Sequence, residues 1–175
     1  VALAAALAVN TTYLSTLNIL PLTKYLLIGY TSIDVAPVAA DAVNDILKAT
    51  SGVVTATVAT DDAAVLRAAL VDAKATDKLT LTVTGTATAA DLKALDAKTS
   101  GQVDATGILK LVGNAADVKA VLASTGVTKA GTVVIDVTGK VSAADVNTIS
   151  KATTGIVTAE VTAGTAAALN KALAD

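Results

Sequence analysis

The sequence contains no cysteine, histidine, methionine, tryptophan or phenylalanine, and its only aromatic residues are three tyrosines. Without cysteine the chain forms no disulfide, no Cys–metal site and no thiol-based catalytic centre. Without histidine it lacks the most common general base and the most common metal ligand. These absences argue against an enzyme, and they leave no identifiable cofactor or small-molecule ligand.

An excess of charge of one sign is missing as well, since 13 basic residues stand against 15 acidic ones. A nucleic-acid-binding surface needs basic residues for the phosphates and often aromatic rings that stack on bases. Nucleic acid is therefore not an expected partner. The apolar runs at 1–9 and 25–30 are too short to cross a bilayer, so we predict no membrane span.

Small aliphatic residues are what the chain has in abundance. The hydrophobic fraction is 53% and consists almost entirely of Ala, Val, Leu and Ile. Because protein interiors are densely packed, such side chains suit thin, regular, closely spaced layers better than a bulky core.

The sequence divides into two parts of different texture. Residues 1–37 hold all three tyrosines and both prolines, and they show no internal repeat. Residues 38–175 are an imperfect tandem repeat. We predict a non-repeating apolar segment over 1–37 and a strand–helix repeat domain over 38–175.

The repeat has two recurring phrases. The first is KATSGVVTATV at 48–58, DAKTSGQVDAT at 96–106 and SKATTGIVTAEV at 150–161, whose glycines lie 49 and 54 residues apart. The second phrase is AAD, which ends at Asp91, Asp117 and Asp145. These aspartates are spaced 26 and 28 residues apart. One unit therefore spans roughly 22–29 residues, and self-similarity at such a period is typical of stacked repeats.

Each unit predicts one short helix and one strand. Three helices should begin at Thr88, Asn114 and Ser142, each of which stands three residues before an aspartate, as an N-cap does. Gly52, Gly101, Gly126 and Gly155 are expected to end helices as left-handed caps.

The strands follow these glycines, and the clearest is 79–84, where apolar residues alternate with threonine. Alternation of strand and helix with short connections predicts an α/β fold with a mostly parallel sheet. We expect the tandem strand–helix repeats to form a parallel-sheet solenoid. A compact doubly wound α/β domain is the alternative.

The order AAD, T(S/T)G, VTA over residues 38–175 resembles the Ala/Thr/Val-rich repeats of very large secreted bacterial proteins. These include marine and cyanobacterial surface proteins, RTX-type proteins among them. The resemblance implies an extracellular or cell-surface location and a role in an adhesin, a surface layer or a filament. The nonapeptide GGxGxD that binds calcium in RTX proteins is absent from this sequence, and no catalytic residue carries over.

Calcium is the one cofactor that the acidic residues could bind. Asp61 and Asp62 are the densest acidic cluster, but no loop supplies the six to eight closely spaced oxygens that Ca²⁺ prefers. The favoured role of this pair is to cap the helix that runs through 65–66. Other acidic residues in or near the predicted strands and turns are Asp77, Asp104 and Asp136.

Other patterns that could carry chemistry are better explained by structure. Ser150 and Lys151 are adjacent at a helix end and point apart, which does not suit a Ser–Lys catalytic pair. Gly139 precedes Lys140 without the upstream glycine of a phosphate-binding loop. Asn114 ends a single leucine-rich-repeat-like LKLVGN phrase and is better explained as a helix cap.

Threonines of the strands raise the alternative of an ice-binding array. Thr80, Thr82 and Thr84 should share one face of their strand. Charged residues interrupt that face in the neighbouring units, at Asp104, Asp136 and Glu160. Ordinary strand propensity therefore accounts for the threonines.

The amino-terminal segment is the main functional candidate. It either caps one end of the stack or docks on the open end of the next subunit. Its predicted assembly interface consists of Leu14, Leu17, Ile19, Leu20, Leu26, Leu27 and Ile28. We therefore predict a structural subunit of an extracellular, self-assembling bacterial surface layer, sheath or filament, a homo-oligomer or polymer held by head-to-tail contacts. The alternative is an adhesin-type binding module for cell adhesion.

Overall fold

A computed structural model describes residues 32–174, with side chains from residue 37 onward. Strands and helices alternate along this part of the chain. The strands are β1 (Ser32–Val38), β2 (Thr55–Val58), β3 (Asp61–Asp62), β4 (Lys78–Thr88), β5 (Val103–Gly113), β6 (Val127–Lys129), β7 (Val134–Val141) and β8 (Val157–Val161). The helices are α4 (Ala40–Ala49), α5 (Ala63–Ala69), α6 (Ala89–Asp96), α7 (Ala115–Ala123), α8 (Ala143–Lys151) and α9 (Ala166–Leu173).

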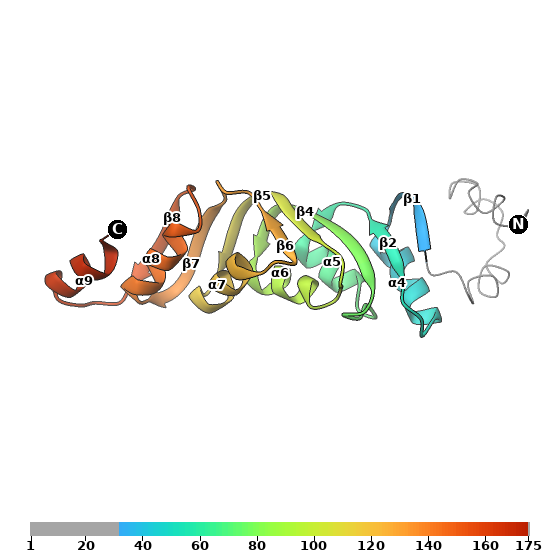
Figure 1. The fold of residues 1–175 in the computed structure, drawn as a ribbon, viewed down its shortest axis with the longest axis horizontal. Coiled ribbons are helices and arrows are strands. Elements are labelled where there is room, and N and C mark those ends of the chain that lie inside the picture. The colour runs from blue at the N-terminus through green and yellow to red at the C-terminus, as the bar shows by residue number, and fades with distance from the viewer. Residues whose placement is uncertain (1–31, 175) are drawn as a thin grey trace, which may run out of the picture.

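All strands belong to one open parallel sheet in the order β1-β2-β4-β5-β7-β8. The short strands β3 and β6 pair with β4 and β5. Each main strand therefore lies beside the next one along the chain, without the reversal of order that a doubly wound sheet has. The α/β class with a parallel sheet is confirmed. The fold is elongated, and β1 and α9 lie at opposite ends of its long axis (Figure 1).

Within residues 32–174 the helices cover one face of the sheet. In β4, Leu79, Leu81 and Val83 are fully buried, whereas Thr80 between them is exposed. The helices form a row in which each contacts the next, and α4 to α8 each pack against the strand that follows them, as α5 does on β4 and α8 on β8 (Figure 1). Burial of a leucine or valine contributes about 1.5–3 kcal/mol each, so this shared layer is the main source of stability.

The helix starts follow the local sequence as predicted. The side chains of Thr88, Asn114 and Ser142 accept hydrogen bonds from the backbone N–H three residues later, at 3.0, 3.0 and 3.1 Å. The last helix keeps only half of this pattern: Thr165 accepts from Ala168 N at 3.2 Å, but no acid stands there. The prediction for Asp61 and Asp62 is wrong, because Asp62 occupies the N-cap position of α5 without a side-chain capping bond.

The prediction of left-handed glycine caps is also wrong. Among the described glycines only Gly85 and Gly139 have positive φ. Gly101 is required for a different reason, since a Cβ there would lie 2.2 Å from Leu79 O in the preceding unit. Gly155 meets Val133 O in the same way at 2.3 Å. These glycines let the backbone of one unit touch the backbone of the unit before it.

The boundary between 37 and 38 falls inside β1, and residues 1–31 lie outside the described part. The division into an amino-terminal segment and a repeat domain therefore stays a prediction.

Candidate functional site

Three of the four buried polar residues of the described part, Asp77, Thr99 and Thr153, hold turns, and the fourth, Asp91, lies in the first turn of α6. Asp77 is 1% exposed, and its two carboxylate oxygens accept from Val54 N at 2.9 Å and Lys74 N at 2.8 Å. Thr99 accepts from Leu79 N and Gly101 N, both at 2.8 Å. Within residues 37–174 no buried side-chain nitrogen or oxygen lacks a hydrogen-bond partner. Such fully satisfied groups specify structure and give no sign of a reactive centre.

A ladder of ion pairs joins successive helices. Arg67 Nε of α5 lies 2.5 Å from Asp91 Oδ1 of α6. Lys93 of α6 is 2.9 Å from Asp117 of α7, and Lys119 of α7 pairs with Asp145 of α8. Each of these aspartates is also the acid that follows an N-cap residue. One carboxylate therefore supports its own helix and binds the previous one.

This double role lowers the pKa of two of the aspartates. The hydrogen bond from Lys93, followed by that from Asn114, holds the pKa of Asp117 below its ordinary value. For Asp145 the corresponding donors are Lys119 and Ser142, and its pKa is lowered too. Sequence reasoning found the caps but missed the ladder. The available signal was a basic residue 24 or 26 positions before each aspartate.

The sequence-derived metal and catalytic candidates are not brought together. Among the described residues, no three side chains of the His, Cys, Asp and Glu types lie close enough to hold a metal ion. Asp61 Oδ1 accepts the backbone N–H of Asp62, and both residues are exposed. Lys140, beside the left-handed Gly139, lies 3.8 Å from Glu160.

The uncovered face of the sheet is polar and mixed in charge. Thr82 pairs with Asp104, and Asp136 pairs with Thr158, so carboxylates interrupt the threonines as expected. Lys110 also reaches Asp136 at 2.8 Å on this face. No uniform threonine array extends across the sheet.

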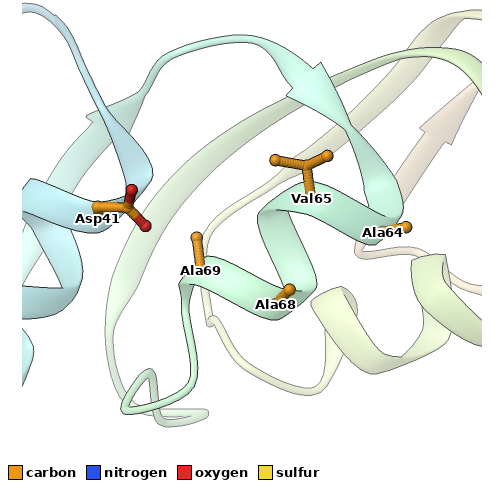
Figure 2. A pocket seen from close by; sticks show the side chains of 5 residues that line it. All are labelled: Asp41, Ala64, Val65, Ala68 and Ala69. Carbon is orange, nitrogen blue, oxygen red and sulfur yellow. The ribbon is translucent and has the colours of Figure 1, made fainter.

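One shallow depression lies between α4 and α5 (Figure 2). It is lined by Asp41, Ala64, Val65, Ala68 and Ala69. Val65 occupies the helix position at which α6, α7 and α8 carry an aspartate. The lining has one carboxylate and otherwise small apolar groups, so little there could orient a ligand.

The most distinctive surface is the end formed by β8 and α9. The phrase IVTAEV at 156–161 repeats VVTATV at 53–58, so β8 and α9 correspond to β2 and α5. The inward-facing residues Ala56 and Val58 of β2 and Val54 just before it are 3%, 1% and 1% exposed. Their counterparts in β8 are only half-buried; they are Val157, Ala159 and Val161.

The two helices differ in the same way. Leu66 and Leu70 of the α5 unit are fully buried, whereas their counterparts Leu169 and Leu173 are half-buried and 44% exposed. The cause is position in the sheet: among the described strands β2 lies between β1 and β4, whereas β8 has β7 as its single neighbour. We call this half-buried apolar end, formed by Val157, Ala159, Val161, Leu169 and Leu173, the tail surface. It combines apolar side chains with the free backbone edge of β8, which is the chemistry of an assembly contact.

The assembly interface predicted between Leu14 and Ile28 lies outside the described residues. No helix within residues 32–174 is both long enough and apolar enough to cross a membrane. The chain matches no protein-family model, no curated protein sequence and no solved structure.

Proposed function

We propose that this chain is a structural subunit of an extracellular bacterial surface layer, sheath or filament, built as an α/β solenoid that stacks head to tail. The observation that carries the proposal is the tail surface, whose apolar positions are buried in the corresponding unit of β2 and α5, where β4 and α6 cover them. An open stack needs a cap or a neighbour at each end. A head-to-tail contact that does not close into a ring extends into a fibre.

Three features support a structural role. The sequence lacks histidine and cysteine. The interior consists of small aliphatic side chains. The polar groups of the turns and helices form hydrogen bonds and ion pairs that hold one unit to the next. In this proposal the chain is not an enzyme. The extracellular location rests on the resemblance of residues 38–175 to repeats of secreted bacterial proteins.

Negative-stain electron microscopy of the purified full chain at high concentration tests the proposal, with and without calcium. Regular fibres or sheets are the expected result. Monomers at every concentration and ionic condition, measured in parallel by light scattering after size-exclusion chromatography, would overturn it.

The uncovered sheet face supports a second candidate, an adhesin-type binding module. This face is broad and carries donors and acceptors such as Thr80, Lys110 and Asp136. A glycan array probed with the full chain tests this role, and specific binding by monomers that do not assemble would favour it. An ice-recrystallisation assay tests the remaining ice-binding variant.

A further inference from the structure

The strand–helix units form pairs. We number them unit 1 (β1–α4), unit 2 (β2–α5), unit 3 (β4–α6), unit 4 (β5–α7), unit 5 (β7–α8) and unit 6 (β8–α9). VNDILKATSGVVTATV at 43–58 and VNTISKATTGIVTAEV at 146–161 are identical at 11 of 16 positions, and both sequences run across the junction of two units. Units 1 and 2 therefore correspond to units 5 and 6.

Units 3 and 4 fit the same scheme. VTG recurs at 83–85 and 137–139, AAD at 89–91 and 143–145, and a T(S/T)G turn at 99–101 and 153–155, always 54 residues apart. Gly85 and Gly139 even share the left-handed backbone, with φ of 74° and 75°. Odd-numbered units are thus of one kind and even-numbered units of another.

This alternation determines what the tail surface fits. Where an even unit is followed along the chain, at units 2 and 4, an odd unit packs onto it. Within residues 32–174 no strand pairs with the forward edge of unit 6, which is even, and β1 of the odd unit 1 pairs with β2 alone. The described residues therefore hold three whole pairs, and a second copy placed head to tail continues the alternation without a break.

We infer that the occupant of the tail surface is the β1–α4 end of a second copy, packed as β4–α6 packs on β2–α5. This inference rests on the proposed self-assembly. It adds which surface of the second copy makes the contact and in which direction the copies stack. The contact would bury Leu169, Leu173 and Val161 as their counterparts in unit 2 are buried. Val38 and Ile46 are partly buried apolar side chains of unit 1.

The existing pairs also define a register. In β2 and β4, Thr57 pairs with Thr80. The counterpart of Thr57 in β8 is Glu160. Ser32 pairs with Thr55 as Thr82 pairs with the equivalent Asp104, so Ser32 is the counterpart of Thr82, two residues after Thr80. Ser32 of the next copy should therefore lie two residues along the strand from the position opposite Glu160, an offset of roughly 7 Å that a short bismaleimide can bridge. With main strands about 4.8 Å apart, a continuous sheet of such copies would repeat every 29 Å or so along its axis.

Single-cysteine variants test this contact, because the natural chain has no cysteine. Ser32→Cys and Glu160→Cys are each treated with a short bismaleimide, separately and as an equal mixture of full chains. We expect cross-linked dimers only in the mixture, since a head-to-tail contact brings unlike ends together. Cross-linking of either variant alone would indicate a symmetric contact and overturn the inference, as would failure of the mixture to cross-link under conditions in which the wild type assembles.

A substitution separates failure of this interface from failure of self-assembly itself. Leu169→Glu places a charge in the tail surface, and Leu109→Glu is the matched control because Leu109 is 76% exposed in the middle of the sheet. We expect Leu169→Glu to raise the protein concentration needed for assembly by about tenfold at least, and Leu109→Glu to leave that concentration unchanged. If the wild type assembles and Leu169→Glu assembles equally well, the contact lies elsewhere. If the wild type never assembles, the proposed function fails first.

Discussion

The hydroxyl of Thr99 offers the sharpest test of how one unit is held to the next. Its Oγ1 accepts hydrogen bonds from Leu79 N and Gly101 N, both at 2.8 Å, in a site where Thr99 is 6% exposed. Thr99→Val keeps the shape of the side chain but removes this acceptor. The buried N–H of Leu79 and the part-buried N–H of Gly101 are then left without their partner.

The expected loss of stability follows from the number of hydrogen-bond donors that lose their partner. A buried donor without a partner costs about 1–3 kcal/mol, so Thr99→Val should lower the free energy of unfolding by about 2–4 kcal/mol after partial relaxation. Thr153 occupies the corresponding turn, 54 residues later, but accepts from only one backbone group, Gly155 N at 2.9 Å. The N–H of Val133 there bonds to Ala130 O instead. Thr153→Val should therefore cost about half as much.

Urea unfolding followed by circular dichroism measures both variants against the wild type. Thr99→Ser and Thr153→Ser serve as controls, because they retain the hydroxyl and should recover most of the loss. Equal losses for the two valine variants, or equal losses for valine and serine at position 99, would refute the reasoning. The comparison is between variants, so it does not require the repeat to unfold in one step.

Three further predictions concern the backbone, the ion ladder and the core. Gly101→Ala should destabilise by about 1–3 kcal/mol, because its Cβ meets a carbonyl oxygen at 2.2 Å, whereas Gly131→Ala, with no atom within 4 Å, should be neutral or slightly stabilising in the same urea titration. The pKa of Asp117 and Asp145 is lowered from the ordinary 3.8, so their stabilising contribution is present above that pH and lost as the pH falls through the folded-state values. The urea concentration at the unfolding midpoint should therefore fall as the pH drops below about 4. It should fall less steeply when Asp117 and Asp145 are both replaced by asparagine. Leu66→Ala, at a fully buried site, should cost about 2–5 kcal/mol by thermal and urea unfolding, and a loss under 1 kcal/mol would show that α5 is not packed as described.

Features with short-range causes were predictable from the sequence. The N-caps at Thr88, Asn114 and Ser142 were correct because each depends on a hydrogen bond between residues three apart. The strand at 79–84 was correct because alternation of apolar residues and threonine follows directly from the two-residue period of a strand.

Features that depend on contacts between units were not predictable in the same way. Gly101 looks like a left-handed cap at the end of a helix, but its lack of a Cβ serves a contact with Leu79, 22 residues earlier. The pairing of Lys93 with Asp117 joins residues 24 apart and requires the spacing of packed helices. No local pattern contains that spacing.

The sequence by itself determined the α/β class, the length of a repeat and the starts of its helices, because hydrophobic period and capping act over a few residues. Only the tertiary structure decided which repeats are covered on both sides. VVTATV and IVTAEV are nearly the same phrase, yet the first is buried between two strands and the second remains half-buried beside one. Burial depends on the neighbour that a strand acquires, and a phrase repeated along the chain does not specify its neighbour.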